Sequence, residues 1–225
     1  MIVNIKQIMQ TKILDTNCYF DYFCTGFYDE KSHNFENEMP NLFIIAGCNG
    51  AGKTTASYTV LPEVLHCAEF VNADEIAKGL SPFNPESMAI PAGKIMLSRI
   101  KDLLSEKLDF AIETTLTTKS YRNFIKKAHS KDYRVSIVFF WLNSPELAIN
   151  RIAERVRNGG HFVPEDVVRR RYVEGIHNLF DIFCKIVDEY IIIDNSAVPS
   201  EVIAEFKNNT LKIFNQGKYE KIQKI

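Results

Sequence analysis

Apolar residues gather in short, nearly uninterrupted runs that alternate along the chain with longer segments of helical periodicity. The run at 135–142 is a series of β-branched and aromatic residues, which is typical of a strand buried on both faces of a parallel sheet. Similar runs predict strands over 42–46, 68–72, 110–112 and 190–193. Strands that alternate with helices indicate a three-layer α/β fold with a mostly parallel five-stranded sheet.

The segments between these runs carry the spacing of amphipathic helices. They predict helices over 53–65, 95–108, 119–130, 144–158, 164–187 and 198–214. A capping residue followed by proline, Asn84-Pro85, opens a further helical stretch, and we expect Pro91 to break or kink it before 95–108 continues.

The first forty residues differ from the rest of the chain. Apolar residues at helical spacing begin the segment, an aromatic run follows at 19–23, and an acidic stretch ends at Pro40. Aromatic residues this dense are expected to pack on the main domain or on a partner. We therefore divide the chain into an N-terminal extension, 1–40, whose role stays open, and one domain, 41–225.

Composition narrows the classes of partner. The 225 residues include 27 Lys and Arg against 28 Asp and Glu, so the net charge of −1 gives no global reason to bind nucleic acid or an anionic membrane. No apolar run approaches the ~18 residues of a membrane span, and Lys6 and Gln7 interrupt any signal-peptide core. The five cysteines lack metal-ligand spacing. We expect a cytoplasmic protein with free thiols.

One motif carries the strongest chemical signal. Residues 47–54, GCNGAGKT, match GxxxxGK[ST] and stand between a predicted strand and a predicted helix. Glycines let successive backbone N–H groups face a phosphate, Lys53 can reach the β- and γ-phosphates, and the Thr54 hydroxyl can hold Mg²⁺. A glycine-rich turn that binds nothing is the alternative, which this context disfavours. The sequence predicts ATP or GTP with Mg²⁺, bound by Gly47, Cys48, Asn49, Gly50, Ala51, Gly52, Lys53, Thr54 and Thr55.

Two acidic residues follow predicted strands, where ligands collect in open α/β sheets. Asp74 could accept a proton from a substrate hydroxyl or help to hold Mg²⁺; the alternative is that it caps a helix starting at Glu75. Glu113 could orient a metal ion and water. The hydroxyls of Thr114 and Thr115 could bind a polar substrate, or could only stabilise a turn.

Six of the nine arginines lie within 151–171, around the sequence NGGHFVPED. Two helices joined by a Gly-Gly loop could form a lid, about 151–172, that aims guanidinium groups at the transferred phosphoryl group. The alternative is a solvated basic helix face. We expect solvent around Arg151 and Arg155, while His161 could touch the substrate or cap a helix. The candidates for phosphate contact are Arg157 and one or two of Arg169, Arg170 and Arg171.

Together these motifs resemble the zeta-toxin-like kinases, in particular a small stand-alone bacterial branch also described as predicted ABC-type ATPases. The matching text is NLFIIAGCNGAGKTT, FVNADEIAKGL, FAIETTLTT and RIAERVRNGGHFVPEDVVRRRY, and the resemblance runs from about 41 to 180. It implies a phosphotransferase that moves the γ-phosphate of ATP or GTP to a hydroxyl of a UDP-N-acetylamino sugar. An antitoxin protein is an implied partner.

The resemblance also implies roles for individual residues. Lys53 corresponds to the P-loop lysine, Asp74 to the general base and Glu113 to the acidic substrate-binding residue. The two charge-neutralising arginines fall on Arg157 and, by spacing, on Arg170, with Arg171 an equal neighbour. The segment 114–116 replaces a Gly-containing loop of larger zeta toxins, which leaves the sugar specificity open.

Two other functions remain open at this stage. A P-loop ATPase or regulatory module could act through a protein partner, although the chain has no LSGGQ-like signature. A kinase of a nucleoside, a polynucleotide end or another small metabolite is the other alternative. A nucleic-acid substrate would need a basic channel, of which the near-neutral chain gives little sign.

Overall fold

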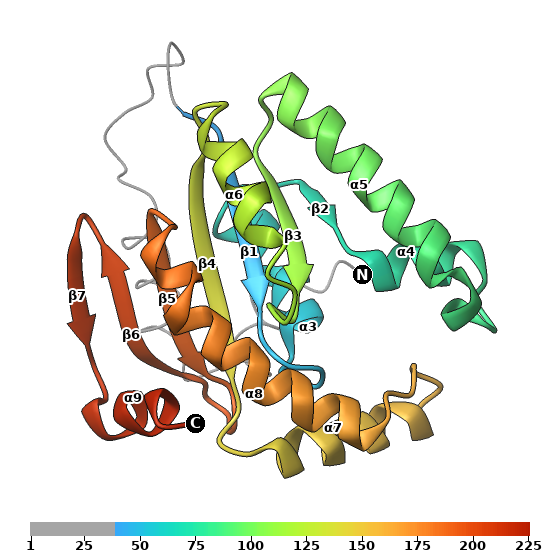
Figure 1. The fold of residues 1–225 in the computed structure, drawn as a ribbon. Coiled ribbons are helices and arrows are strands. Elements are labelled where there is room, and N and C mark those ends of the chain that lie inside the picture. The colour runs from blue at the N-terminus through green and yellow to red at the C-terminus, as the bar shows by residue number, and fades with distance from the viewer. Residues whose placement is uncertain (1–38) are drawn as a thin grey trace, which may run out of the picture.

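A computed structural model describes residues 39–225, so the predicted helix and the aromatic run of the N-terminal extension lie outside the described residues. The described chain forms a seven-stranded sheet in the order β2-β3-β1-β4-β5-β6-β7 (Figure 1). The first five strands of that order are parallel, as predicted. The strands are β1 (Asn41–Ala46), β2 (Glu69–Val71), β3 (Phe110–Thr114), β4 (Arg134–Trp141), β5 (Glu189–Asp194), β6 (Glu201–Lys207) and β7 (Thr210–Ile213).

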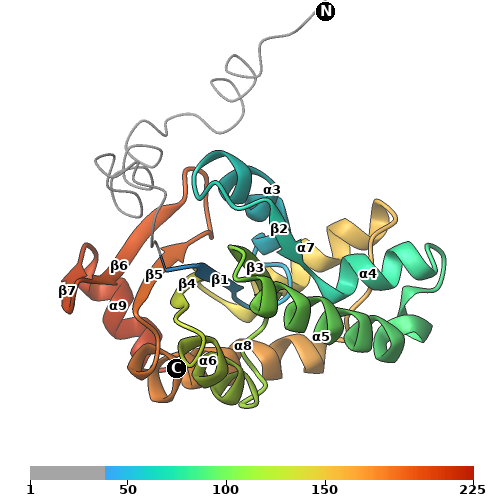
Figure 2. The same ribbon diagram turned by 90° about the horizontal axis from the view of Figure 1, so that it is seen from above.

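Helices cover both faces of this sheet. In Figures 1 and 2, α3 lies on one face while α6 and α8 lie on the other, which confirms the three-layer arrangement. The helices are α3 (Lys53–Glu63), α4 (Ala73–Leu80), α5 (Ala89–Glu106), α6 (Tyr121–His129), α7 (Pro145–Arg157), α8 (Glu165–Asp181) and α9 (Gln216–Gln223), with short 3₁₀ helices η1 (Pro85–Met88) and η2 (Phe183–Lys185). No helix within 39–225 is both long and apolar enough to cross a membrane.

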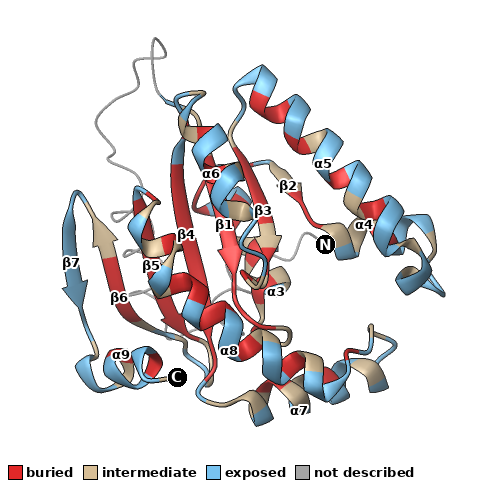
Figure 3. Cartoon of the chain, in the orientation of Figure 1, coloured by how far each residue is buried: buried red, intermediate tan, exposed pale blue. Residues whose placement is uncertain are grey.

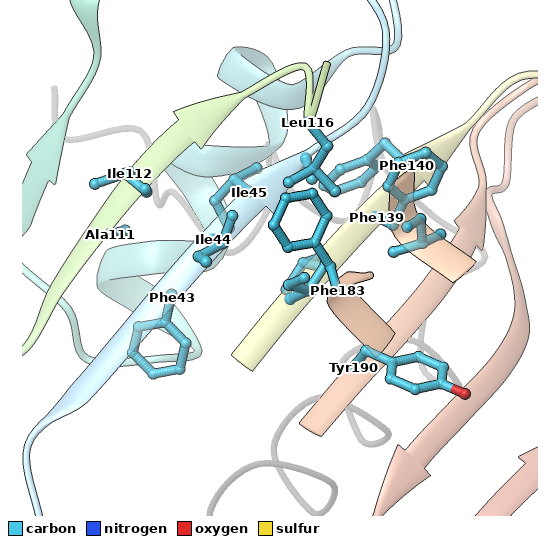
Figure 4. Close-up of a cluster of buried hydrophobic side chains, with 14 of the residues drawn as sticks. Phe43, Ile44, Ile45, Ala111, Ile112, Leu116, Phe139, Phe140, Phe183 and Tyr190 are labelled. Carbon is cyan, nitrogen blue, oxygen red and sulfur yellow. The ribbon is translucent and has the colours of Figure 1, made fainter. Parts of the chain in front are cut away.

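The core lies along the central strands. Figure 3 shows β1, β4 and β5 buried over nearly their whole length, as their continuous apolar runs predict. Figure 4 shows side chains of these strands meeting Leu116, from the segment after β3, and Phe183 of η2. Trp141, which ends β4, is 2% exposed and belongs to this core.

The predicted helix over 198–214 is wrong, because this region forms a hairpin. β6 pairs antiparallel with β5 and with β7, and Tyr190 stacks on Phe206 with ring centroids 5.4 Å apart. Asn208 and Asn209 make the turn with φ of 50° and 58°, a left-handed pair typical of tight hairpins. The five predicted strands are therefore extended by two, and the last helix is the unpredicted α9.

Two predicted helix limits also differ from the structure. α5 runs without a break from Ala89, and Pro91 lies in its first turn, where a backbone N–H has no partner within the helix. Of the break or kink predicted at Pro91, the break is therefore wrong, and the kink stays a prediction. The helix predicted to reach 187 ends at Asp181, after which η2 brings Phe183 into the core.

The parallel strands bring their carboxyl ends to one edge of the sheet. Ile45 of β1 is in register with Glu113 of β3, and Val71 of β2 is in register with Ile112. In Figure 1 the arrowheads of β1 and β3 point toward α7 and α8. The segments that follow β1, β2 and β3 therefore meet next to the α7–α8 hairpin. Ligands bind at this edge, the carboxyl ends of the strands, in open α/β sheets.

Candidate active site

The GCNGAGKT loop joins β1 to α3 and has the backbone that its glycines permit. Gly47 has a φ of 138°, and a Cβ there would lie 2.3 Å from the carbonyl oxygen of Phe140. Gly52 has a φ of 86°, and a Cβ there would lie 2.5 Å from Nδ2 of Asn195. The backbone contact therefore excludes a larger residue at Gly47, whereas at Gly52 a larger residue would strain the positive φ and displace the Asn195 amide. The loop leads into the N-terminus of α3, whose partial positive charge favours a bound anion.

Lys53 and Thr54 meet a carboxylate from the neighbouring strand. Lys53 is 6% exposed; its Nζ donates to the carbonyl oxygen of Cys48 at 3.0 Å and lies 3.5 Å from Oε1 of Glu113. The Thr54 hydroxyl donates to Oε2 of Glu113 at 2.8 Å. The structure thus brings together three residues that are up to 60 positions apart in the sequence, as the common strand edge predicts. A hydroxyl beside a carboxylate supplies the oxygen donors that Mg²⁺ prefers, so these residues fit that ion.

Asp74 does not cap α4. Asn72 is the N-cap, and its Oδ1 accepts from the backbone N–H groups of Asp74 at 2.8 Å and Glu75 at 3.4 Å. The capping alternative for Asp74 is therefore wrong, and its exposed carboxylate is available for another role. Asn72 also donates through Nδ2 to Oε2 of Glu113 at 2.8 Å, which ties the start of α4 to the P-loop edge.

The opposite side of the P-loop is held by the segment after β5. Asn195 donates through Nδ2 to the carbonyl oxygen of Ala51 at 2.8 Å. Beside it, Asp194 is 6% exposed and accepts from Lys218 of α9 at 2.6 Å. Burial raises the pKa of Asp194, but hydrogen bonds from Lys218 and Ser196 outweigh it, so the pKa lies below its usual value.

The hydroxyls after Glu113 stabilise a turn. The buried Thr114 hydroxyl accepts from the backbone N–H of Leu116 at 3.1 Å, and Leu116 has a φ of 57°. Thr115 is half-buried, and its Oγ1 lies 3.0 Å from Oγ1 of Thr117. Asn178 of α8 donates to the carbonyl oxygen of Leu116 at 2.8 Å. The Thr114 hydroxyl thus stabilises the turn, which was the alternative to substrate binding. A substrate contact by Thr115 stays a prediction.

The three consecutive arginines of α8 point in different directions. Arg171 is half-buried and donates from Nη1 to Oδ1 of Asn49, in the P-loop, at 3.0 Å. Arg169 pairs with Glu146 of α7 at 2.5 Å on the exposed surface. Arg170 is exposed, and the residues one and two turns further along the same face, Glu174 and His177, are exposed too. The structure therefore brings Arg171 to the P-loop, while a catalytic role for Arg170 stays a prediction.

The loop between α7 and α8 is tied to its own helix and to η1. Arg155 donates to the carbonyl oxygen of His161 at 2.7 Å, and Nδ1 of His161 lies 3.5 Å from Oε1 of Glu86. Arg151 is half-buried and donates to the carbonyl oxygen of Ser196 at 3.3 Å. Arg155 is thus exposed, as expected, although it donates to a carbonyl group, whereas Arg151, also expected in solvent, is half-buried. Arg157, the last residue of α7, is exposed at the end nearest this loop.

The P-loop also contains a thiol. Cys48 is 5% exposed, and burial raises its pKa to about 11, although Lys53 opposes the shift. The thiol is therefore protonated at neutral pH and contributes packing and its backbone to the loop. Cys48, Cys67 and Cys184 are free cysteines, as expected for this part of the chain.

The fold and the loop after β1 define a P-loop nucleotide-binding protein. The model of one protein family, described as AAA domain, matches residues 42–172, and the chain belongs to that family. An uncharacterized protein of Haemophilus influenzae is 31% identical over 126 residues, which cover 56% of this chain and 88% of the relative.

Solved structures share the fold at low sequence identity. A chain of the AvrRxo1-ORF1:AvrRxo1-ORF2 complex, crystallised with sulphate ions, has a TM-score of 0.69 at 16% identity; the match covers 82% of this chain and 63% of that one. The same complex crystallised with ATP gives a TM-score of 0.66. A chain from the PezAT toxin–antitoxin system of Streptococcus pneumoniae has a TM-score of 0.58 at 18% identity, covering 92% and 93%. The resemblance to zeta-toxin-like kinases is thus confirmed for the fold.

Two asparagines of the site were missed by the sequence reasoning. Asn72 precedes two acidic residues and an apolar stripe, a pattern that signals an N-cap and should have excluded Asp74 from that role. Asn195 lies in a loop without a recognisable motif, so only the structure reveals its bond to Ala51.

Proposed function

We propose that the protein transfers the γ-phosphate of ATP or GTP to a hydroxyl group of a small polar acceptor. One observation carries the proposal: Lys53 and Thr54 both contact Glu113 at the edge of the sheet where α4 begins. Asp74, in the first turn of α4, is exposed and is not the N-cap of that helix. A phosphate cradle beside a solvent-facing carboxylate supplies the two requirements of transfer to an alcohol, a bound triphosphate and a proton acceptor.

The P-loop residues 47–55 would hold the triphosphate. The backbone N–H groups of the loop and the N-terminus of α3 would neutralise part of its charge. Lys53 would exchange its bond to the Cys48 carbonyl for the β- and γ-phosphates. Thr54, with Glu113 next to it, would hold Mg²⁺, which would supply positive charge to offset that of the triphosphate.

Asp74 would act as general base. The acceptor oxygen forms a bond to the γ-phosphorus, the bond between that phosphorus and the β,γ-bridging oxygen breaks, and the nucleoside diphosphate leaves. The acceptor proton passes to the Asp74 carboxylate. A positioned base contributes about 10²–10⁴-fold to such a step, so it accounts for part of the rate and the phosphate cradle for the rest.

Arginines of the lid would stabilise charge on the transferred group. Arg171 already donates to the P-loop residue Asn49, which supports a place for it at the nucleotide. Arg157 and Arg170 are the candidates that would have to turn inward when the lid closes. A guanidinium group suits this role because it can donate two parallel hydrogen bonds to two phosphoryl oxygens.

For the acceptor we propose a UDP-N-acetylamino sugar. The support is the resemblance to zeta-toxin-like kinases, whose motifs this chain carries, and the shared fold with a chain of the PezAT system. The residues proposed to contact it are Asp74, Glu113, Thr115 and His161, with Thr114 shaping the turn. The contact between His161 and Glu86 would bound the acceptor side of the crevice.

A neutralising protein partner forms part of the proposal. Both groups of structural neighbours come from two-component assemblies, AvrRxo1-ORF1:AvrRxo1-ORF2 and the PezAT toxin–antitoxin system. An antitoxin of this kind would bind the present chain and block transfer. Growth inhibition on expression, relieved by co-expression of the partner, is the expected consequence.

The experiment is an acceptor screen. The protein is incubated with ATP, Mg²⁺ and a panel of nucleotide sugars, nucleosides and sugars, and products are analysed by mass spectrometry. The proposal predicts an acceptor that gains one phosphate, with UDP-N-acetylamino sugars the best substrates. Hydrolysis of ATP with no phosphorylated acceptor would instead identify an ATPase or a regulatory module, and a phosphorylated nucleoside would identify another metabolite kinase.

A further inference from the structure

Asn72 is a buried amide at the junction of the two halves of the site. It follows β2, caps α4, and is 6% exposed. Val71 and Ile112 are in register, so the next residues on the two strands, Asn72 and Glu113, are neighbours at the carboxyl edge. This position places the Asn72 side chain between the start of α4 and the P-loop.

Both ends of the Asn72 amide are used. Its Oδ1 accepts from the backbone N–H groups of Asp74 at 2.8 Å and Glu75 at 3.4 Å, while its Nδ2 donates to Glu113 at 2.8 Å. The two backbone donors determine which atom is oxygen, because an NH₂ group in that place would face two N–H groups. Aspartate could supply the acceptor but not the donor, and serine is too short to reach both sides.

The amide therefore joins three groups that the proposed reaction uses. Oε2 of Glu113 accepts from Asn72 and from the Thr54 hydroxyl, each at 2.8 Å. The same asparagine fixes the first turn of α4, from which Asp74 projects. A single side chain thus sets the distance between the oxygen donors at the triphosphate and the proposed base. A misplacement of about 1 Å between such groups can cost about 10²-fold in rate.

We propose that Asn72 is a positioning residue for phosphoryl transfer, which holds Glu113 on Thr54 and fixes Asp74 at the start of α4. This inference rests on the proposed function. It assigns to an uncharged residue, which touches neither phosphate nor acceptor, control over the geometry of two carboxylates.

The chain contains a matched control for this residue. Asn215 caps α9: its Oδ1 accepts from the backbone N–H of Lys218 at 3.1 Å, and its Nδ2 donates to Oε1 of Glu201 at 2.7 Å. Asn215 therefore makes the same two kinds of bond, as helix cap and as carboxylate donor, on the last helix of the chain. Loss of a cap or of a carboxylate bond as such affects both positions, whereas loss of positioning affects only Asn72.

The test compares Asn72→Ser and Asn72→Asp with Asn215→Ser and Asn215→Asp. Serine and aspartate both cap helices well, so all four variants are expected to fold. We expect Asn72→Ser to lower kcat about 10-fold, and Asn72→Asp about 100-fold because two carboxylates then oppose each other, while KM for ATP changes less than about threefold. The Asn215 variants should keep the wild-type kcat. Equal kcat values for the Asn72 and Asn215 variants would overturn the inference.

A second measurement does not depend on turnover. In the crystal structure of Asn72→Ser, the Glu113 carboxylate should have left the Thr54 hydroxyl, whereas Asn215→Ser should keep that bond. An unchanged Thr54–Glu113 bond in Asn72→Ser would overturn the inference. Wild-type protein that phosphorylates no acceptor would instead refute the proposed function, and this structural comparison would still decide whether Asn72 positions Glu113.

Discussion

The two sides of the crevice differ in how far they are assembled. On the phosphate side, residues from four segments are joined by bonds of 2.8–3.0 Å: Lys53 to Cys48, Thr54 and Asn72 to Glu113, and Asn195 to Ala51. On the lid side, Arg157 and Arg170 are exposed and Arg169 pairs with Glu146 at the surface. Between the α7–α8 hairpin and the other walls of the crevice, Arg171 reaches Asn49 and His161 reaches Glu86.

This difference indicates a division of work. A site that is already assembled loses little conformational entropy when the nucleotide binds, so the phosphate side should determine affinity. In the proposed function, the exposed Arg157 and Arg170 would reach the transferred group through a movement of the hairpin, so the lid side should determine turnover. Substitutions on the two sides should therefore separate binding from rate.

The largest combined effect on transfer and on ATP affinity is expected at Lys53, on the phosphate side. Lys53→Ala removes the buried cation that the proposed function assigns to the phosphates, so transfer should fall by at least about 10²–10³-fold, and ATP affinity should fall with it. Isothermal calorimetry and the transfer assay measure the two quantities. Lys126→Ala, on the exposed face of α6, is the control and should match the wild type. Tight ATP binding by Lys53→Ala would contradict the assigned place of the triphosphate.

A smaller effect is expected at the arginines of α8. Arg171→Ala should lower kcat about 10²-fold, since the guanidinium group that donates to Asn49 of the P-loop is lost, and Arg171→Lys should restore little because lysine lacks the planar fork. Arg169→Ala removes only an exposed ion pair and should stay within twofold of the wild type. If Arg170→Ala loses turnover and Arg171→Ala does not, the charge-neutralising residue is Arg170, as the spacing of the resemblance implies.

The smallest effect on activity is expected behind the phosphate side, at Lys218. Lys218→Met leaves the buried Asp194 without its cation and should lower the free energy of unfolding by about 1–2 kcal/mol, less than for a fully buried pair because Lys218 is about a third exposed. The pKa of Asp194 is lowered in the fold, so this stability is present above its unfolded pKa of about 4 and is lost as pH falls further.

Denaturant unfolding at several pH values measures this effect. The difference between wild type and Lys218→Met should be full near neutral pH and should shrink below about pH 4. Lys224→Met, which removes an exposed pair with Glu220 on the same helix, is the control and should cost at most about 0.5 kcal/mol. A difference that persists unchanged at low pH would contradict the role of the Asp194 charge.

Much of the fold could be predicted because local patterns agree with the tertiary structure. Continuous apolar runs predicted the parallel strands. The positions of the P-loop and Glu113 after predicted strands placed both at one edge of the sheet, where Lys53 and Thr54 contact Glu113. The β6–β7 hairpin was misread as a helix because Val202, Ile203 and Ala204 interrupt the polar–apolar alternation. The Asn208-Asn209 turn was the available signal.

Within the site, the sequence did not show in which direction individual side chains point. Sequence spacing places Arg169, Arg170 and Arg171 on one helix, but which one faces the P-loop depends on the rotation of α8, which the buried Tyr172 and Gly175 fix through packing. Asn195 contacts Ala51 across 144 positions, a relation that no local pattern records. Asn72 could have been identified as a cap, but its bond to Glu113 depends on the register of β2 and β3.

The central claim is that Asp74 takes the acceptor proton. Its carboxylate is available for this role because Asn72, not Asp74, caps α4. The most direct test is the transfer rate of Asp74→Asn, measured with the acceptor found in the screen and compared with its ATP affinity. The account predicts that transfer falls by about 10²–10⁴-fold while ATP binds as in the wild type. Full transfer activity in Asp74→Asn would contradict it.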